Sequence, residues 1–243
     1  MTARGLPRAV SFTKDVRMRR ILFLLTFGLG GLAVLLSLGT WQMQRLDWKQ
    51  ELLAEMESRI AAPAIPLPAA ATEADDEYIA VTLTGTPTGQ ELHVLSSGSA
   101  AGTGYRVISA WVTNDNRRIM VDMGVMPLEA KSIAPALAEQ TITGNLFWPD
   151  DAAATSPAPD LNANIWFARD TAAMAEALGT EPLMVALRTT TAPDPRVTIV
   201  PVNTAGIKND HREYAITWFL LAFVWAVMTG YFLYRSSKDS KKD

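Results

Sequence analysis

The feature that most constrains this chain is a pair of long apolar runs without any charged side chain. Ile21–Leu38 contains eighteen such residues and Tyr214–Tyr234 contains twenty-one. A helix rises ~1.5 Å per residue and the hydrocarbon core of a bilayer is ~30 Å thick, so both runs can cross it. We therefore predict a membrane protein with transmembrane helices at residues 21–41 and 209–234, the second range including an interfacial turn.

The distribution of charge predicts the orientation of these helices. Residues 1–20 carry six basic and one acidic side chain, and residues 235–243 carry four basic and two acidic ones. The two tails together have a net charge of +7, whereas residues 21–234 have a net charge of −10. Short cationic flanks stay in the cytoplasm, so both termini are predicted to be cytoplasmic. A cleaved signal peptide is the alternative interpretation of the first run, although no A-x-A cleavage site follows it.

The segment between the two runs is predicted to form one domain on the far side of the membrane. Helical periodicity continues over residues 42–60, and three prolines within residues 61–76 predict an extended linker. Residues 77–208 contain eight short β-type runs separated by turn residues. They are Tyr78–Thr84, Glu91–Ser96, Tyr105–Thr113, Ile119–Val125, Thr141–Phe147, Ile165–Ala168, Leu183–Leu187 and Val197–Val202.

One short helix is predicted within this domain, over Asp170–Leu178. Asp170 is a favourable N-cap and Gly179 a favourable C-terminal stop. The fold class is therefore a membrane protein of α+β type. Two transmembrane helices flank a mostly antiparallel β domain, barrel-like or sandwich-like, with one short helix.

Motifs that would indicate an enzyme are missing from the sequence. G-x-S-x-G, G-x-G-x-x-G, H-E-x-x-H and C-x-x-C patterns do not occur, and there is no cysteine to form a disulfide or a thiolate metal site. We therefore expect a protein that is not an enzyme. The chain has two histidines, and His93, within the predicted strand E-L-H-V-L, is expected to be a residue of the sheet.

The second histidine, His211, lies where the second apolar run meets the outer aqueous face. Tyr214 and Trp218 follow it at i+3 and i+7 and so fall on the same helical face. An imidazole at the edge of a bilayer, backed by aromatic surface, has the parts for axial ligation of a haem iron. The alternative is an interfacial histidine beside a tyrosine and a tryptophan that act as membrane anchors.

Residues at the outer end of the first run complete this candidate site. Trp41 and Arg45 are placed there as cofactor-binding candidates, and Trp41 alone is also typical of an aromatic belt. Together with Lys208 and Arg212, Arg45 offers a positive charge for pairing with the carboxylates of a haem.

Four segments of the chain resemble the Surfeit locus protein 1 family. They are G-T-W-Q-M-Q-R at Gly39–Arg45, G-Y-R-V-I at Gly104–Ile108, W-F-A-R-D at Trp166–Asp170 and N-D-H-R-E-Y-A-I-T-W-F at Asn209–Phe219. The resemblance runs from about residue 22 to residue 235, in the order and spacing of the family. One segment departs from it: where the family typically has V-N-R-G-[WF]-[VI]-P, Met123 and Val125 replace the arginine and the aromatic residue.

This resemblance implies a divergent bacterial member, located in the inner membrane with its central domain in the periplasm. It implies an assembly factor for a haem-copper terminal oxidase that assists haem a delivery to, or maturation of, subunit I. The family's histidine maps onto His211, so haem a is the expected cofactor. The expected partners are cytochrome oxidase subunit I, haem A synthase and the membrane, with no nucleic acid. A haem-free scaffold or accessory subunit that stabilises a subunit I intermediate remains the alternative.

Overall fold

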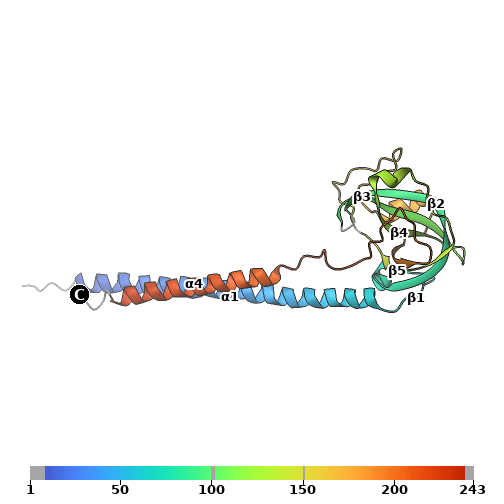
Figure 1. The fold of residues 1–243 in the computed structure, drawn as a ribbon. Helices are drawn as coiled ribbons and strands as arrows, with labels where there is room; N and C mark the ends of the chain where they lie inside the picture. The colour runs from blue at the N-terminus through green and yellow to red at the C-terminus, as the bar shows by residue number, and fades with distance from the viewer. Residues whose placement is uncertain (1–8, 100–101, 150, 239–243) are drawn as a thin grey trace, which may run out of the picture. The chain divides into compact units, whose positions relative to one another are not determined.

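The computed structural model describes residues 9–99, 102–149 and 151–238 (Figure 1). The chain divides into two compact units. The helical unit contains the chain up to Leu53 and from Ile207 onwards, and the barrel unit contains Ala54–Gly206. The outermost parts of the two predicted basic tails, residues 1–8 and 239–243, lie outside the described residues.

Two long helices make up the helical unit. They are α1 (Ala9–Ala61), whose last turns belong to the barrel unit, and α4 (His211–Lys238). Both are long and apolar enough to cross a membrane, and only 6% of each apolar window is buried. Lipid-facing helices have this low burial, whereas the core helix of a soluble protein is mostly covered. The predicted continuation of the first helix to residue 60 is confirmed.

Glycines on one face of α1 let the two helices approach closely. A Cβ atom would lie 2.3 Å from Thr229 if added at Gly28, 2.6 Å from Trp225 at Gly31 and 2.7 Å from Phe219 at Gly39. The Trp225 indole N–H also donates a 2.9 Å hydrogen bond to the carbonyl oxygen of Gly28. Residue numbers therefore increase along α1 while those of the facing residues on α4 decrease, so the two helices are antiparallel. Small residues at such a contact are typical of helix pairs in membranes.

The barrel unit is built on one closed sheet. Its strands are β1 (Ile65–Pro66), β2 (Ala80–Ser99), β3 (Gly102–Thr113), β4 (Arg118–Pro127), β5 (Gln140–Phe147) and β6 (Met184–Thr190). The order is β1-β2-β3-β4-β6-β5, and an additional β2–β5 pairing closes the barrel (Figure 1). Only β1–β2 and β4–β6 are parallel pairs among the described strands. The predicted α+β fold with a mostly antiparallel, barrel-like domain is confirmed.

Strand β2 turns a corner of the barrel, which the sequence did not predict. The predicted strands Tyr78–Thr84 and Glu91–Ser96 are the two halves of this one strand. The first half pairs with β5 and the second with β3, and the register shifts between Pro87 and Glu91. Gly89 lies within that shift with a φ of +84°, a conformation that glycine adopts without strain. Turn-type residues therefore mark a bend within a strand here and not the end of one.

Two further predicted strands are reduced to isolated bridges. Within Ile165–Ala168, Ile165 bridges Asp160 and Trp166 bridges Val94, and within Val197–Val202, Thr198 bridges Val125. The bridge to Val125 requires Gly124, whose φ is +111° and where a Cβ would lie 2.2 Å from the Thr198 carbonyl oxygen. Both segments are β-like in sequence because they lie against the sheet, but each forms only isolated bridges.

The linker predicted over residues 61–76 contains regular structure. Strand β1 and the four-residue helix α2 (Glu73–Asp76) both fall within it. Leu67 and Ala71 pack against the barrel core, so part of this segment belongs to the barrel unit's packing. Apolar side chains between the prolines explain why it is not a free linker.

The predicted short helix is confirmed as α3 (Thr171–Leu178). The Asp170 side chain accepts a 3.0 Å hydrogen bond from the Ala173 N–H, and Gly179 ends the helix with a φ of +64°. A 3-10 turn, η1 (Leu128–Ser132), follows β4.

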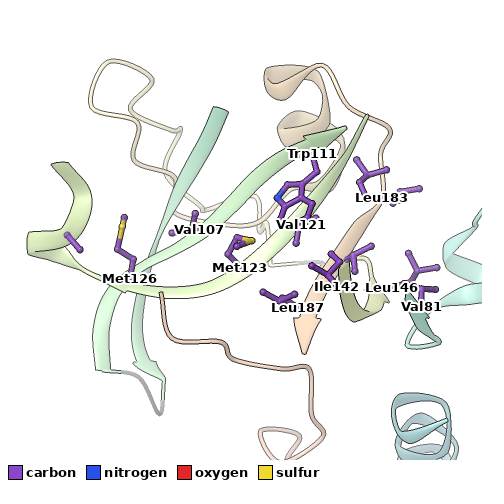
Figure 2. Packing of buried hydrophobic residues seen from close by; sticks show 13 residues of the cluster. Val81, Val107, Trp111, Val121, Met123, Met126, Ile142, Leu146, Leu183 and Leu187 are labelled. Atoms are coloured by element: carbon purple, nitrogen blue, oxygen red, sulfur yellow. The ribbon is translucent and has the colours of Figure 1, made fainter. Parts of the chain in front are cut away.

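Two apolar clusters stabilise the barrel unit. One surrounds the fully buried Trp111 (Figure 2), and the other packs α3, with Met174, against the sheet beside Trp166. Met123, one of the departures from the family pattern, lies in the first cluster with only 5% of its surface exposed. It falls at the register shift between β3 and β4, so the irregular strand turns this side chain into the core. An apolar residue suits that position.

Asp122 joins two of the segments that resemble the family, through Arg106 and Arg169. Its carboxylate accepts a 2.6 Å hydrogen bond from Arg106 and lies 3.5 Å from Arg169. Burial raises the pKa of Asp122, and the two guanidinium groups oppose that rise. Arg169 also pairs with Asp151 at 2.5 Å. This ionic cluster links β3, β4 and the segment before α3.

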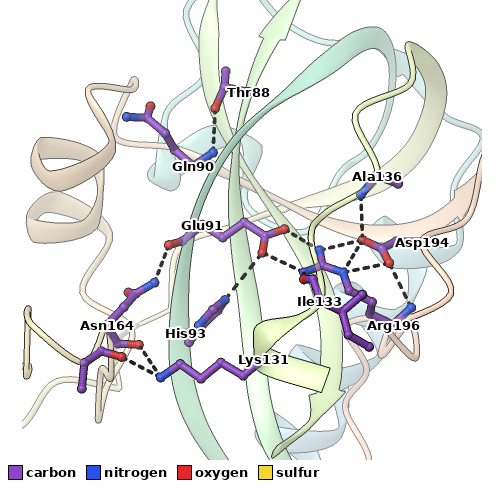
Figure 3. Close-up of polar contacts among 11 residues, drawn as sticks. Thr88, Gln90, Glu91, His93, Lys131, Ile133, Ala136, Asn164, Asp194 and Arg196 are labelled. Carbon is purple, nitrogen blue, oxygen red and sulfur yellow. Dashed lines mark hydrogen bonds and ion pairs between the residues drawn. The ribbon is translucent and has the colours of Figure 1, made fainter. Parts of the chain in front are cut away.

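A second buried ionic cluster contains Glu91, Asp194 and Arg196 (Figure 3). The Arg196 guanidinium, 3% exposed, contacts Glu91 at 2.8 Å and Asp194 at 2.7 Å, and it donates to the Ile133 carbonyl oxygen. His93 Nε2 lies 3.5 Å from the Glu91 carboxylate. Burial by itself would raise the pKa of both carboxyl groups, but the hydrogen bonds and charge around them outweigh burial and lower both values.

Replacing Arg196 by methionine should destabilise the barrel unit by about 3–5 kcal/mol, because two buried carboxylates lose their cation. Lowered carboxyl pKa values contribute stability above the usual pKa near ~4, and this stability disappears as the pH falls through the folded values. The variant should therefore lose less stability on acidification than the wild type does. Denaturant unfolding of the full chain in detergent, followed by tryptophan fluorescence at neutral and acidic pH, measures both effects.

The control is Arg59→Met, which breaks a pair with the exposed Glu55 carboxylate and hydrogen bonds to the carbonyl oxygens of Asp75 and Glu77. An exposed pair contributes only about 0–1 kcal/mol. An Arg196→Met variant no less stable than this control, or with an unchanged pH dependence of stability, would contradict the role of Arg196 as the cation that stabilises the two buried carboxylates.

The close helix pair can be tested by cross-linking, because the natural chain contains no cysteine. A Cβ at position 28 would lie 3.3 Å from the Thr229 Cβ, near the ~3.5–4.5 Å of disulfides. The pair Gly28→Cys and Thr229→Cys should therefore form a disulfide under mild oxidation in membranes. The pair Gly30→Cys and Thr229→Cys should not, because a Cβ at Gly30 has no neighbour within 4 Å. Equal cross-linking of both pairs would rule out this helix register.

Candidate functional site

His211 contacts Gln42 across the helical unit. The His211 Nδ1 atom lies 2.8 Å from the Gln42 Oε1 atom. An amide oxygen can only accept a hydrogen bond, so Nδ1 carries the proton of the neutral ring. The other ring nitrogen, Nε2, then keeps its lone pair and can bind a metal. The contact therefore selects one tautomer and one orientation of the imidazole.

Helix register brings these two side chains together. Gly28, Gly39 and Gln42 lie on the α1 face that meets α4, and His211 shares its α4 face with the buried Ala215. His211 is also the first residue of α4, where the Asp210 carbonyl oxygen accepts from the backbone N–H groups of Glu213 and Tyr214. The ring is half-buried, so it is held by the helix pair but still accessible.

The other residues predicted for the site are placed around this contact. Trp218 is half-buried on the same α4 face as His211. Tyr214 is 57% exposed and Trp41 51% exposed, so both point away from the contact between the helices. Within the described parts of the chain, no hydrogen bond, ion pair or ring contact joins Trp41, Tyr214 or Arg45 to His211. The structure therefore joins His211 to Gln42 and leaves the aromatic candidates on the exposed helix surfaces.

Three exposed cations lie close in sequence to the two ends of this contact. Arg45 places its guanidinium 4.3 Å from the centre of the Trp48 ring. The side chains of Lys208 and Arg212 are exposed just before and after the start of α4. The Lys49 ammonium group donates to the Lys208 carbonyl oxygen and so ties the start of α4 to α1.

This donor set fits a haem held by one protein ligand. It offers a single imidazole with an open Nε2 and exposed cations for carboxylates. It does not fit a bare metal ion, because no group of three or more metal-binding side chains gathers among the described residues. The second histidine, His93, is buried in β2 of the barrel unit.

Comparison with known proteins places this chain in a family. The model of the SURF1 family matches residues 29–223, a range that includes Gln42, the whole barrel and His211. The chain belongs to the SURF1 family. The resemblance noted in the four sequence segments is thereby confirmed.

Curated members of the SURF1 family match over most of their length. Surfeit locus protein 1 of Rattus norvegicus is 30% identical over 221 residues, covering 79% of this chain and 71% of the relative. The SURF1-like protein of Rickettsia conorii is 28% identical over 214 residues, covering 83% and 87% respectively. That of Rickettsia bellii is 28% identical over 218 residues, covering 86% and 89%.

Gln42 is the residue of this candidate site that the sequence analysis missed. The α1 candidates predicted from the sequence lie on the face of Trp41, Arg45 and Trp48, and the structure leaves this face exposed. Gln42 follows Gly28 by fourteen positions and Gly39 by three, so helical spacing places it on the glycine face. Recognising that face as the contact with α4 would have identified it.

The tautomer of His211 can be tested by nuclear magnetic resonance of the full chain with ¹⁵N-labelled histidine. His211 should show the Nδ1–H tautomer, and Gln42→Leu should shift it toward a mixture because the acceptor is lost. The chain has only two histidines, so a His93→Gln variant assigns the signals. An Nε2–H tautomer in the wild type, or no response to Gln42→Leu, would exclude the proposed role of Gln42.

Proposed function

We propose that this chain is an assembly factor for a haem-copper terminal oxidase. It accepts haem a in the bacterial inner membrane and presents it to subunit I. The observation that carries the proposal is the His211–Gln42 contact, which leaves Nε2 of a half-buried imidazole available as an axial ligand. Membership of the SURF1 family supports the assembly role, since that role is what the family resemblance implies.

The residues of the helical unit would divide the binding of haem a among them. His211 supplies the axial nitrogen and Gln42 keeps it in the binding tautomer. Arg45, Lys208 and Arg212 offer charges for the two carboxylates of the haem. Haem a is the cargo in this proposal, so when bound it contributes only an iron for coordination and its bulk. A single histidine ligand suits a site that must release the haem again.

Partners and location follow from the same proposal. Subunit I is the recipient of the haem and haem A synthase is the donor. The cationic tails support cytoplasmic termini, and the acidic segment between the two apolar helices supports a periplasmic barrel unit. The chain would act by binding and transfer, not as an enzyme.

The test is the visible spectrum of the protein purified from cells that make haem A. We expect haem a to co-purify with the wild type and to fall at least about tenfold in His211→Ala, because the metal loses its only protein ligand. His93→Gln is the matched control, because it removes the other histidine from a different unit, and it should retain the haem.

The outcome separates haem delivery from the scaffold alternative. Haem a that persists in His211→Ala would contradict the ligand assignment. If the wild-type protein contains no haem a and deletion of the protein still blocks oxidase maturation, the result would favour the haem-free scaffold that stabilises a subunit I intermediate. In that case His211→Ala would support maturation as well as the wild type does.

A further inference from the structure

An apolar groove lies between α1 and α4 within the apolar part of the helical unit. It encloses about 570 Å³. Its lining consists of Phe23, Thr26, Phe27, Gly30, Gly31, Val34, Leu35 and Trp225. Almost all of this surface is aromatic, aliphatic or glycine, so the groove suits a hydrocarbon and offers little to a polar ligand.

The two glycines in the lining differ in what they do. A Cβ added at Gly31 would lie 2.6 Å from the Trp225 ring, so Gly31 serves the packing of α1 on α4. A Cβ added at Gly30 would meet nothing within 4 Å. Gly30 therefore opens the wall of the groove without serving the helix contact. A larger side chain at this position would fill space that the fold leaves empty.

The groove is continuous with the exposed face of α1 that carries Arg45. Gly30, Val34, Trp41, Arg45 and Trp48 follow at i, i+4, i+11, i+15 and i+18 along one unbroken helix. These spacings place them on one face. That face is apolar and recessed in the middle of the apolar segment, and it becomes aromatic and cationic near the level of Gln42. This order matches an amphipathic ligand with a charged head and a long hydrocarbon tail.

We propose that this groove binds the farnesyl chain of haem a, and this inference rests on the function proposed above. The farnesyl group distinguishes haem a and haem o from haem b, which carries a vinyl group at the same position of the porphyrin. Gly31 lies eleven residues before Gln42, about 16 Å along the helix at ~1.5 Å per residue. An extended farnesyl chain is of that order of length. With the iron on His211, the tail reaches the groove by passing from the level of Gln42 onto the neighbouring α1 face, which carries Gly30 and Arg45.

Selection of the tail depends on packing and not on the hydrophobic effect. Lipid chains are as apolar as the groove, so burial of the tail gains little by itself in a membrane. A branched, partly rigid isoprenoid gains by fitting against Phe27 and Trp225 across the space at Gly30. A straight lipid chain that fills the same groove is the competing occupant, and it would give no discrimination between haems.

The experiment measures dissociation constants of haem a, haem o and haem b for the full chain in detergent, by absorption titration. We expect haem a and haem o to bind about tenfold more tightly than haem b, the lower end of what shape selection in an apolar pocket achieves. Gly30→Leu should abolish this preference by weakening haem a and haem o, and it should leave the affinity for haem b unchanged. The unchanged affinity for haem b shows that the variant is folded and that His211 still binds iron.

Gly230→Leu is the matched control. A Cβ at Gly230 also meets nothing within 4 Å, and Gly230 lies on α4 outside the groove lining. It should keep the preference for farnesylated haems. Equal affinities for all three haems in the wild type, or a preference that survives Gly30→Leu, would overturn the groove assignment and leave the His211 proposal standing. Failure of the wild type to bind any haem, or binding that persists in His211→Ala, would overturn both.

Discussion

Close packing of α1 against α4 is the constraint on which the candidate site depends. Gly28, Gly31 and Gly39 let the helices approach until side chains of one touch the backbone of the other. The Trp225 hydrogen bond to the Gly28 carbonyl oxygen fixes their register. That register brings Gln42 opposite His211. A change of even one helical position would rotate one side chain away and leave the imidazole free to adopt either tautomer.

The segments that resemble the family serve two different purposes. Those that contain Arg106 and Arg169 meet at the buried Asp122 carboxylate, and their charged side chains hold parts of the barrel together. Those around Gln42 and His211 lie in the helical unit, where a polar contact is formed and a ring nitrogen stays open. The proposed metal ligand therefore lies at the start of α4, beside α1. In the barrel unit, the buried charged side chains Asp122, Asp194 and Arg196 form internal ion pairs.

The predictable parts of the structure were those set by local sequence. The apolar runs predicted both long helices, and Asp170 and Gly179 predicted α3 with its caps. The predictions that failed concern features that depend on contacts between residues distant in sequence. The bend of β2 near Gly89 was predicted as a break between two strands, because β2 is continuous only through its pairing with β5 and then β3. At the site, His211 was found from its position, but its partner required knowledge of which α1 face meets α4.

The central claim is that His211 offers Nε2 to a haem iron while the Gln42 amide oxygen accepts a hydrogen bond from Nδ1–H. Resonance Raman spectroscopy of the ferrous haem complex measures the stretching frequency of the iron–histidine bond directly. The account predicts a band that is absent in His211→Ala and lies at lower frequency in Gln42→Leu, because a hydrogen bond at the second nitrogen makes the ligand more basic. A band unchanged in Gln42→Leu, or one that persists without His211, would contradict it.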